Sequence, residues 1–134
     1  AYVIDGPADR RTSVGGARLR LDGGDGGEQA AASIAGVGDT DGDGVPELAI
    51  GAPRAHGGSG AVYLVRGDRS GSMPLASADV IFVGNAAGDL LGTSVSGAQD
   101  VNGDGLSDIL IGAPGSDTSA DNAGAAYLFL GQPR

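Results

Sequence analysis

Residues 39–53 read DTDGDGVPELAIGAP, and residues 100–114 read DVNGDGLSDILIGAP. The two stretches lie 61 residues apart, and the same offset aligns SIAG at 33–36 with SVSG at 94–97. A repeat of roughly this length indicates one supersecondary unit per copy, each stacked on its neighbours. We therefore interpret the chain as a series of tandem units.

Each unit reads as four short strands, and no stretch of ten or more residues keeps a helical period. The apolar runs that follow the acidic loops are short and end at glycine, as in buried strands. Arg18 and Arg20 alternate with leucines, as on a half-exposed strand. This pattern predicts an all-β fold made of β-propeller blades with four antiparallel strands each. The predicted strands are 1–4, 17–21, 31–37, 47–51, 61–66, 79–83, 92–98, 108–112 and 125–130.

The strand count divides the chain into three parts. Residues 1–27 supply the last two strands of a preceding blade, residues 28–84 form a complete blade, and residues 85–134 form a second blade that lacks its fourth strand. About two blades make an incomplete propeller. We expect either a piece of a longer propeller or a subunit whose open ends are covered by other copies, as in a homo-oligomer.

The composition agrees with many turns and a modest core. Glycine accounts for 27 of the 134 residues, aromatic residues make up 4%, and cysteine is absent. Glycine at this density between short β-branched runs indicates tight turns. The lack of cysteine excludes a disulfide scaffold, a thiolate zinc site and thiol catalysis. Since no apolar stretch approaches the roughly 18 residues of a membrane span, we expect no membrane insertion.

The formal net charge is −9, from 17 acidic and 8 basic residues, and every basic residue is arginine. An acidic surface argues against nucleic acid or anionic membrane as a partner. Seven of the acidic residues lie in the segments 39–47 and 100–108. Charge concentrated in this way requires a counter-charge, and a divalent cation can supply it.

The two acidic segments place oxygen-bearing side chains at positions 1, 3, 5 and 9, and glycine at position 6. Calcium takes six to eight oxygen ligands at about 2.3–2.6 Å and tolerates irregular geometry. Glycine at position 6 permits the sharp turn through which the carbonyl of position 7 joins the ligands. We predict two calcium sites, one formed by Asp39, Asp41, Asp43, the Val45 carbonyl and Glu47, the other by Asp100, Asn102, Asp104, the Leu106 carbonyl and Asp108.

Three other interpretations of these loops fit the sequence less well. The EF-hand opens with the same spacing but closes with glutamate at position 12, where this chain has Ile50 and Ile111. The following residues are strand-like, so the predicted site lies in a β-hairpin. Asp-Gly and Asn-Gly also form simple hairpin turns, but the identical register of the two loops disfavours that explanation. Magnesium matches less well, because it keeps several waters.

Together, these elements resemble the FG-GAP repeats of integrin α-subunit propellers and their bacterial relatives. Leu91-Gly92 stands at the Phe-Gly position, and residues 51–53 and 112–114 are the Gly-Ala-Pro elements. The resemblance implies calcium in the loop between the first two strands of a blade, seven blades in a complete ring, and a secreted or cell-surface protein. Ala30-Ala31 replaces Phe-Gly in the first unit, and Glu47 replaces the usual aspartate. The arginine-only, Gly- and Ala-rich composition indicates a bacterial relative.

The expected function is that of a calcium-stiffened module for adhesion, with protein or glycan as its ligand and further blades as its neighbours. His56 is the only histidine and the serines lack a triad pattern, so we expect no catalytic residue and no enzyme activity. Two alternatives stay open: a non-catalytic propeller segment of a secreted enzyme, and a self-assembling subunit joined through open blade edges.

Overall fold

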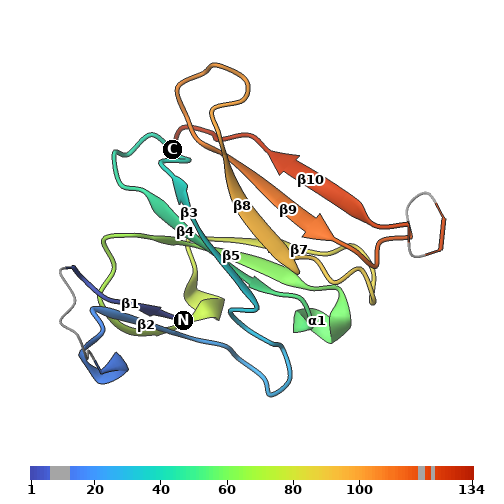
Figure 1. The fold of residues 1–134 in the computed structure, drawn as a ribbon, viewed down its shortest axis with the longest axis horizontal. Coiled ribbons are helices and arrows are strands. Elements are labelled where there is room, and N and C mark those ends of the chain that lie inside the picture. The colour runs from blue at the N-terminus through green and yellow to red at the C-terminus, as the bar shows by residue number, and fades with distance from the viewer. Residues whose placement is uncertain (7–12, 118–119, 122) are drawn as a thin grey trace.

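The computed structural model describes residues 1–6, 13–117, 120–121 and 123–134. It is an all-β structure whose three sheets lie side by side (Figure 1). The strands are β1 Tyr2–Val3, β2 Leu19–Asp22, β3 Ser33–Gly38, β4 Glu47–Ala52, β5 Ala61–Arg66, β6 Gly71–Pro74, β7 Val80–Val83, β8 Ser94–Gln99, β9 Asp108–Ala113 and β10 Ala125–Phe129. Three short helical turns accompany them: η1 Val14–Gly16, α1 Ala55–Gly58 and η2 Leu75–Ser77.

The middle sheet has the strand order β3-β4-β5-β7, and every neighbouring pair in it is antiparallel. The last sheet has the order β10-β9-β8 and is antiparallel as well. These two sheets, one of four strands and one of three, confirm the predicted all-β class. The predicted strands are present to within about two residues at their ends.

The first sheet contains a strand that the sequence did not reveal. β1 and β2 are antiparallel, as predicted, but β6 adds to the other edge of β2 in a parallel register, with Leu19 opposite Gly71. β6 follows β5 in the chain, so the segment between the third and fourth strands of the middle sheet reaches across to the preceding sheet. β2 also starts two residues later than predicted, because residues 14–16 form a 3-10 turn.

The core forms two clusters, one on each face of the middle sheet. Side chains alternate between the faces of a strand, so neighbouring residues of β4 and β5 belong to different clusters. Ile50 and Tyr63 pack with Leu19 and other residues of the first sheet. Ala49, Val62 and Leu64 pack with Ile109 and Ile111 of the last sheet. The middle sheet is thereby covered on both faces, as a blade in a propeller is.

The middle and last sheets approach closely where glycine removes the side chain. A Cβ placed on Gly92 would lie 2.5 Å from the Ala61 carbonyl oxygen and 2.9 Å from Val62 Cγ2. Gly92 also has φ +85°, a left-handed conformation that glycine adopts without steric cost. The hydroxyl of Ser33 donates to the Gly92 carbonyl across the same junction, at 2.8 Å.

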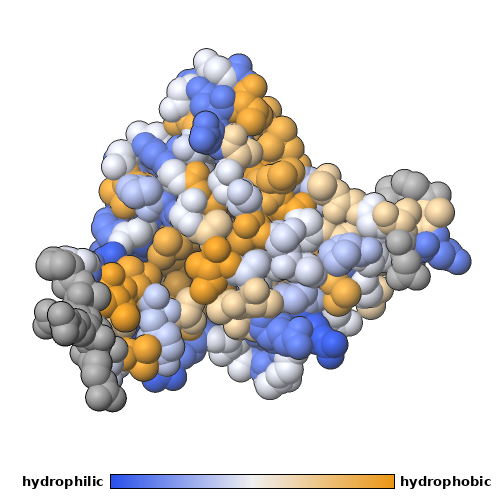
Figure 2. Space-filling view, in the orientation of Figure 1, coloured by the Kyte–Doolittle hydropathy of each residue, from blue (hydrophilic) through white to orange (hydrophobic). Residues whose placement is uncertain are grey.

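The outer strands leave apolar side chains in contact with solvent. Val80, Ile81 and Val83 of β7 and Leu128 of β10 are each at least two-fifths exposed. Figure 2 shows hydrophobic residues at several places on one face of the molecule. Within the ranges that the structure describes, no helix has the length and apolar character needed to cross a bilayer.

Candidate metal centre

Both acidic segments form the connection between the first and second strands of a sheet. Residues 39–46 join β3 to β4, and residues 100–107 join β8 to β9, at the end of the molecule opposite α1 (Figure 1). Each loop is entered through a register shift, between Gly36 and Gly38 in one sheet and between Gly97 and Gln99 in the other. The shared irregularity sets the same entry geometry for both loops.

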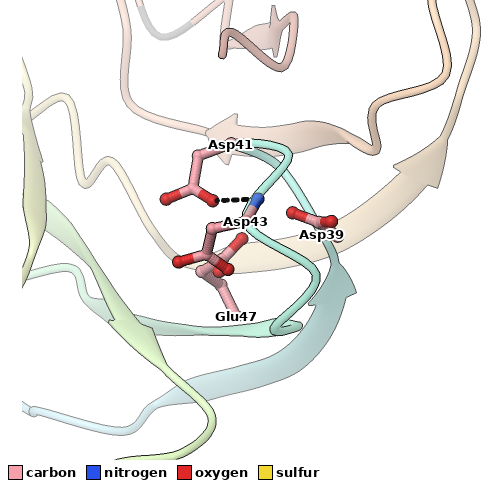
Figure 3. Close-up of side chains that lie close together, drawn as sticks. All are labelled: Asp39, Asp41, Asp43 and Glu47. Atoms are coloured by element: carbon pink, nitrogen blue, oxygen red, sulfur yellow. Dashed lines mark hydrogen bonds between the residues drawn. The ribbon is translucent and has the colours of Figure 1, made fainter. Parts of the chain in front are cut away.

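Loop one, residues 39–47, brings four carboxylates together. Asp39, Asp41, Asp43 and Glu47 each offer an oxygen, and these oxygens lie within 4.8 Å of one another (Figure 3). Across the described parts of the chain, this is the one group of at least three acidic or histidine side chains that meets this distance. Gly42 and Gly44 have φ of +78° and +82°, which lets the backbone curl tightly around the carboxylates.

The backbone of loop one holds each aspartate in place. Asp39 accepts hydrogen bonds from the N–H groups of Gly42 and Gly44, at 2.8 and 2.9 Å. Asp41 accepts from the Asp43 N–H at 3.2 Å, and Asp43 accepts from the Val45 N–H at 2.8 Å. Carboxylates fixed in this way need little rearrangement to receive a cation.

Glu47 carries the observation that points most directly to a cation. It is 3% exposed, and its Oε2 accepts from the N–H and the hydroxyl of Thr40, at 2.8 and 2.7 Å. Its Oε1 is buried, and it is the one buried side-chain N or O atom of the described residues that has no hydrogen-bond partner. An unpartnered buried carboxylate oxygen costs several kcal/mol unless a cation or donor meets it. The donor set of loop one therefore fits a hard divalent cation.

Two arginines already balance part of the charge of loop one. Arg66 lies at the end of β5 and pairs with Asp43 at 2.9 Å and with Asp68 at 2.9 Å. The hydrogen bond to Asp68 raises the pKa of Arg66 above its ordinary value, and attraction to Asp43 adds to this. Arg134 pairs with Asp41 through its Nε. The guanidinium groups thus contact the two aspartates at positions 3 and 5.

Loop two, residues 100–108, shares the backbone of loop one but not its cluster of charge. Asp100 accepts from the N–H groups of Gly105, Gly103 and Asp104, at 2.8, 2.6 and 3.1 Å. The hydrogen bond from Gly105 is the largest of the effects that lower the pKa of Asp100. Asn102 donates from its amide to Asp104 at 2.8 Å, so the neutral side chain takes up one carboxylate oxygen.

Asp108, at position 9 of loop two, is fully buried. Its Oδ2 accepts from the Val101 N–H and its Oδ1 from the Gly131 N–H, both at 2.8 Å. Both oxygens therefore have backbone partners, unlike those of Glu47. Since aspartate is one methylene shorter than glutamate, its carboxylate stays close to β9.

A backbone hydrogen bond joins the two loops. The Ser107 N–H donates to the Asp39 carbonyl at 2.8 Å. The C-terminal residues then run beside loop one, where the N–H groups of Gln132 and Arg134 donate to the carbonyls of Thr40 and Asp41, at 2.9 and 3.1 Å (Figure 1). The segment 131–134 thus contacts both loops.

The structure places every predicted ligand residue in one of these two loops. Loop one gathers its four acidic side chains; Asp100, Asp104 and Asp108 do not reach the same mutual distance. Val45 and Leu106, predicted to bind through their carbonyls, donate their N–H groups to Asp43 and Asp104. The sequence did not reveal the roles of Thr40, Arg66, Gly131 and Arg134. Their spacing carries no motif, because the fold brings them to the loops.

Comparison with known proteins identifies the repeat. The FG-GAP repeat model matches residues 31–65 and 91–129, and each match contains one acidic loop. The chain is 32% identical over 111 residues to integrin alpha-PS5 of Drosophila melanogaster, 37% over 90 residues to integrin alpha-4 of Xenopus laevis, and 37% over 75 residues to integrin alpha-10 of Homo sapiens.

These alignments cover 80%, 65% and 55% of this chain, but 10%, 8% and 6% of the respective integrins. The chain therefore spans about a tenth or less of the length of the curated relatives it matches. The alignments support the resemblance to integrin α-subunits that the repeats indicated. The expectation of a bacterial relative stays a prediction.

Proposed function

The chain belongs to the FG-GAP repeat family, and from this premise we propose that it is a calcium-binding β-propeller module that presents a surface to a protein or glycan ligand outside the cell. The observation that carries the proposal is the cluster of four carboxylates in loop one, with the unpartnered buried oxygen of Glu47. A cation at that position would supply the missing partner and neutralise the mutual repulsion of the carboxylates.

In loop one the ion would be held by Asp39, Asp41, Asp43, the Val45 carbonyl and Glu47. In loop two it would be held by Asp100, Asn102, Asp104, the Leu106 carbonyl and Asp108. Oxygen-only ligand sets of this size match calcium better than zinc or magnesium. Loop two has one carboxylate fewer, and its carboxylates are farther apart, so it is the weaker of the two proposed sites.

Calcium in these loops would stiffen the blades. Each loop joins two strands, and loop one is bonded to loop two through Asp39 and Ser107. The ion would act as a cross-link between position 1 before the turn and position 9 on the next strand. A ligand-binding surface elsewhere on the blades would then be held in one conformation, at a reduced entropic cost of binding.

The remaining blades of the propeller are the proposed neighbours of the exposed strands. In this interpretation residues 1–27 end a preceding blade, residues 28–84 form a full blade, and residues 85–134 begin the next. Apolar side chains of β7 and β10 would be covered by further blades of the same or other chains. A self-assembling subunit is the second candidate, favoured by β10, which lies at an unpaired sheet edge.

The module is proposed to be non-catalytic, because the polar residues that recur between the repeats are occupied as ligands or turn residues. His56 lies in α1 with φ +51° and does not join the carboxylates of either loop. A role as a non-catalytic segment of a secreted enzyme is compatible with this assignment and differs from it only in what the rest of the protein does.

Isothermal titration calorimetry tests the proposal. Calcium is titrated into protein stripped over a chelating resin, and the same titration is run on Glu47→Gln, which keeps an acceptor for Thr40 but removes one negative charge. We expect two calcium ions per chain in the unmodified protein, with the tighter event weakened at least tenfold in the variant. Failure to bind any calcium at millimolar concentration would refute the proposal.

A further inference from the structure

Three of the eight arginines gather at one open depression beside loop one. The depression has a volume of about 520 Å³ and is lined by Arg66, Asp68, Arg69, Ser70 and Arg134. These residues come from the end of β5, the turn after it and the C-terminal segment, which the fold brings together. We call this depression the arginine pocket. Each of the three arginines is paired with at least one aspartate: Arg66 with Asp43 and Asp68, Arg69 with Asp79, and Arg134 with Asp41.

The guanidinium groups of the pocket are only partly used by the protein. Arg69 pairs through one terminal nitrogen with Asp79, and Arg134 pairs through Nε with Asp41. Each guanidinium has five N–H donors. The ion pair of Arg69 is made by one of its three guanidinium nitrogens, Nη2, and that of Arg134 by one of its three, Nε. Donors in excess of acceptors are what an external oxyanion requires.

Two of the three arginines are held by the proposed metal ligands. Arg66 contacts Asp43, and Arg134 contacts Asp41. A cation in loop one would neutralise the negative charge of these two aspartates. Both guanidinium groups would then be less strongly attracted to the loop and could bind another anion. Their side chains are 26% and 48% exposed, which leaves them room to turn toward the pocket.

We propose that the arginine pocket binds a tetrahedral oxyanion, such as the sulfate or phosphate group of a monoester, and that a cation in loop one tightens this binding. Three guanidinium groups from separate points of the chain suit an anion with several terminal oxygens, because each group can bond a different one. The inference rests on the proposed metal binding at loop one. By linkage, the oxyanion tightens the cation by the same factor.

The experiment is a titration with methyl sulfate, followed by NMR of the arginine Nε–H signals, in calcium-loaded and in resin-stripped protein. Methyl phosphate provides the second arm, and the tighter of the two probes identifies the source of the oxyanion. We expect signals of Arg66, Arg69 and Arg134 to shift, with affinity at least fivefold higher when calcium is bound. Arg20, which pairs with exposed Asp22 on another sheet, should not shift.

Two variants make the test specific. Arg69→Gln removes a pocket donor that contacts neither acidic loop, so it should weaken methyl sulfate at least tenfold while calcium binding stays unchanged. Arg20→Gln is the matched control and should alter neither affinity. Thermal unfolding of each variant verifies that it is folded. Arg69→Lys, which keeps a charge for Asp79 but lacks the planar fork of donors, serves in place of Arg69→Gln if the latter is not.

The outcomes separate this inference from the proposed function. Calcium binding without any shift by either probe would overturn the oxyanion site alone. Probe binding of equal affinity with and without calcium would overturn the link to loop one. If calcium itself does not bind, the proposed function fails, and the linked site fails with it.

Discussion

Loop one and loop two have the same length, the same glycine at position 6 and the same entry from a distorted strand, yet they distribute charge differently. In loop one, four carboxylates converge and Glu47 keeps one buried oxygen without a partner. In loop two, the Asn102 amide bonds Asp104, and Asp108 satisfies both oxygens with backbone N–H groups. The residues at positions 3 and 9 differ between the loops. These two differences separate a loop whose carboxylates cluster from a loop whose carboxylates already have hydrogen-bond partners within the protein.

The difference teaches that an acid at position 9 can serve two purposes. Asp108 ties its own loop to the C-terminal segment through Gly131, whereas Glu47 bonds Thr40 with one oxygen and presents the other to the loop interior. The shorter side chain supports the fold without any ion. The longer side chain, that of Glu47, keeps one buried oxygen without a hydrogen-bond partner, and a cation would supply that partner.

The largest expected effect follows from replacing Asp108 by alanine. The change leaves the Val101 and Gly131 N–H groups without acceptors near a fully buried position, which should lower the free energy of unfolding by about 3 kcal/mol. In metal-free buffer Glu47→Gln should cost less than about 1 kcal/mol, because glutamine still accepts from Thr40. Urea unfolding followed by circular dichroism measures the free energy of unfolding of both variants. Equal losses in the two variants would contradict the difference described between Asp108 and Glu47. Asp25→Ala, on an exposed loop, is the control.

Calcium is expected to raise the free energy of unfolding by about 2.7 kcal/mol per site at a hundredfold excess over the dissociation constant. Glu47→Gln should remove the larger part of this gain and Asp104→Asn the smaller part. Thermal melts with calcium and after resin treatment measure the difference. Superimposable melts of the unmodified protein would mean that calcium does not stabilise the fold.

The junction between the sheets gives a smaller effect. Gly92→Ala places a methyl group 2.5 Å from the Ala61 carbonyl oxygen in a left-handed conformation, so it should cost about 2 kcal/mol. Thermal unfolding measures this cost. An unchanged melting temperature would show that the two sheets are not packed as closely as described.

The equivalent position of the first repeat predicts a change of opposite sign. Ala31 aligns with Gly92 and has φ +70°, which strains a residue with a Cβ. Ala31→Gly should stabilise the protein by about 0.5 kcal/mol, because relief of the strain exceeds the added entropy of the unfolded chain. Destabilisation on chemical unfolding would contradict this explanation.

The smallest effect expected is that of pH, through Asp79. Burial would raise the pKa of this carboxyl, but hydrogen bonds from the Arg66 N–H and the Arg69 guanidinium outweigh it and lower the pKa. The stabilisation is therefore present above the unfolded-state pKa of about 3.9 and is lost as the pH falls through the lower folded value. Melts of the unmodified protein and Asp79→Asn should differ at pH 6 and converge in strong acid; a constant difference would contradict this.

Much of the fold could be predicted from the sequence, because periodicity and the 61-residue offset report directly on strands. The strand β6 could not. Gly71–Pro74 has no alternating pattern, and its pairing with β2 depends on how the turn after β5 folds back. Ala31 aligns with Gly92, and both adopt the left-handed conformation. The alignment alone did not establish this conformation for an alanine, and it is seen only in the structure.

In the acidic loops, too, some features could be predicted from the sequence and others could not. Spacing alone identified the carboxylates, since alternation within a tight turn brings side chains to one side. It could not distinguish the free oxygen of Glu47 from the satisfied oxygens of Asp108, because that depends on Gly131, located 23 residues beyond Asp108. The arginine partners of loop one could not be predicted from the sequence either, because Arg134 and Asp41 are far apart in the chain and are brought together by the fold.

The central claim, that two calcium ions bind and that loop one binds more tightly, is tested most directly by NMR. The N–H groups of Gly44 and Gly105 donate to the position-1 aspartates Asp39 and Asp100, at 2.9 and 2.8 Å, so their signals report on each loop separately. In a calcium titration of resin-stripped protein, both signals should move and saturate, with Gly44 saturating at the lower concentration. Two unmoved signals at millimolar calcium, or saturation of Gly105 first, would contradict the claim.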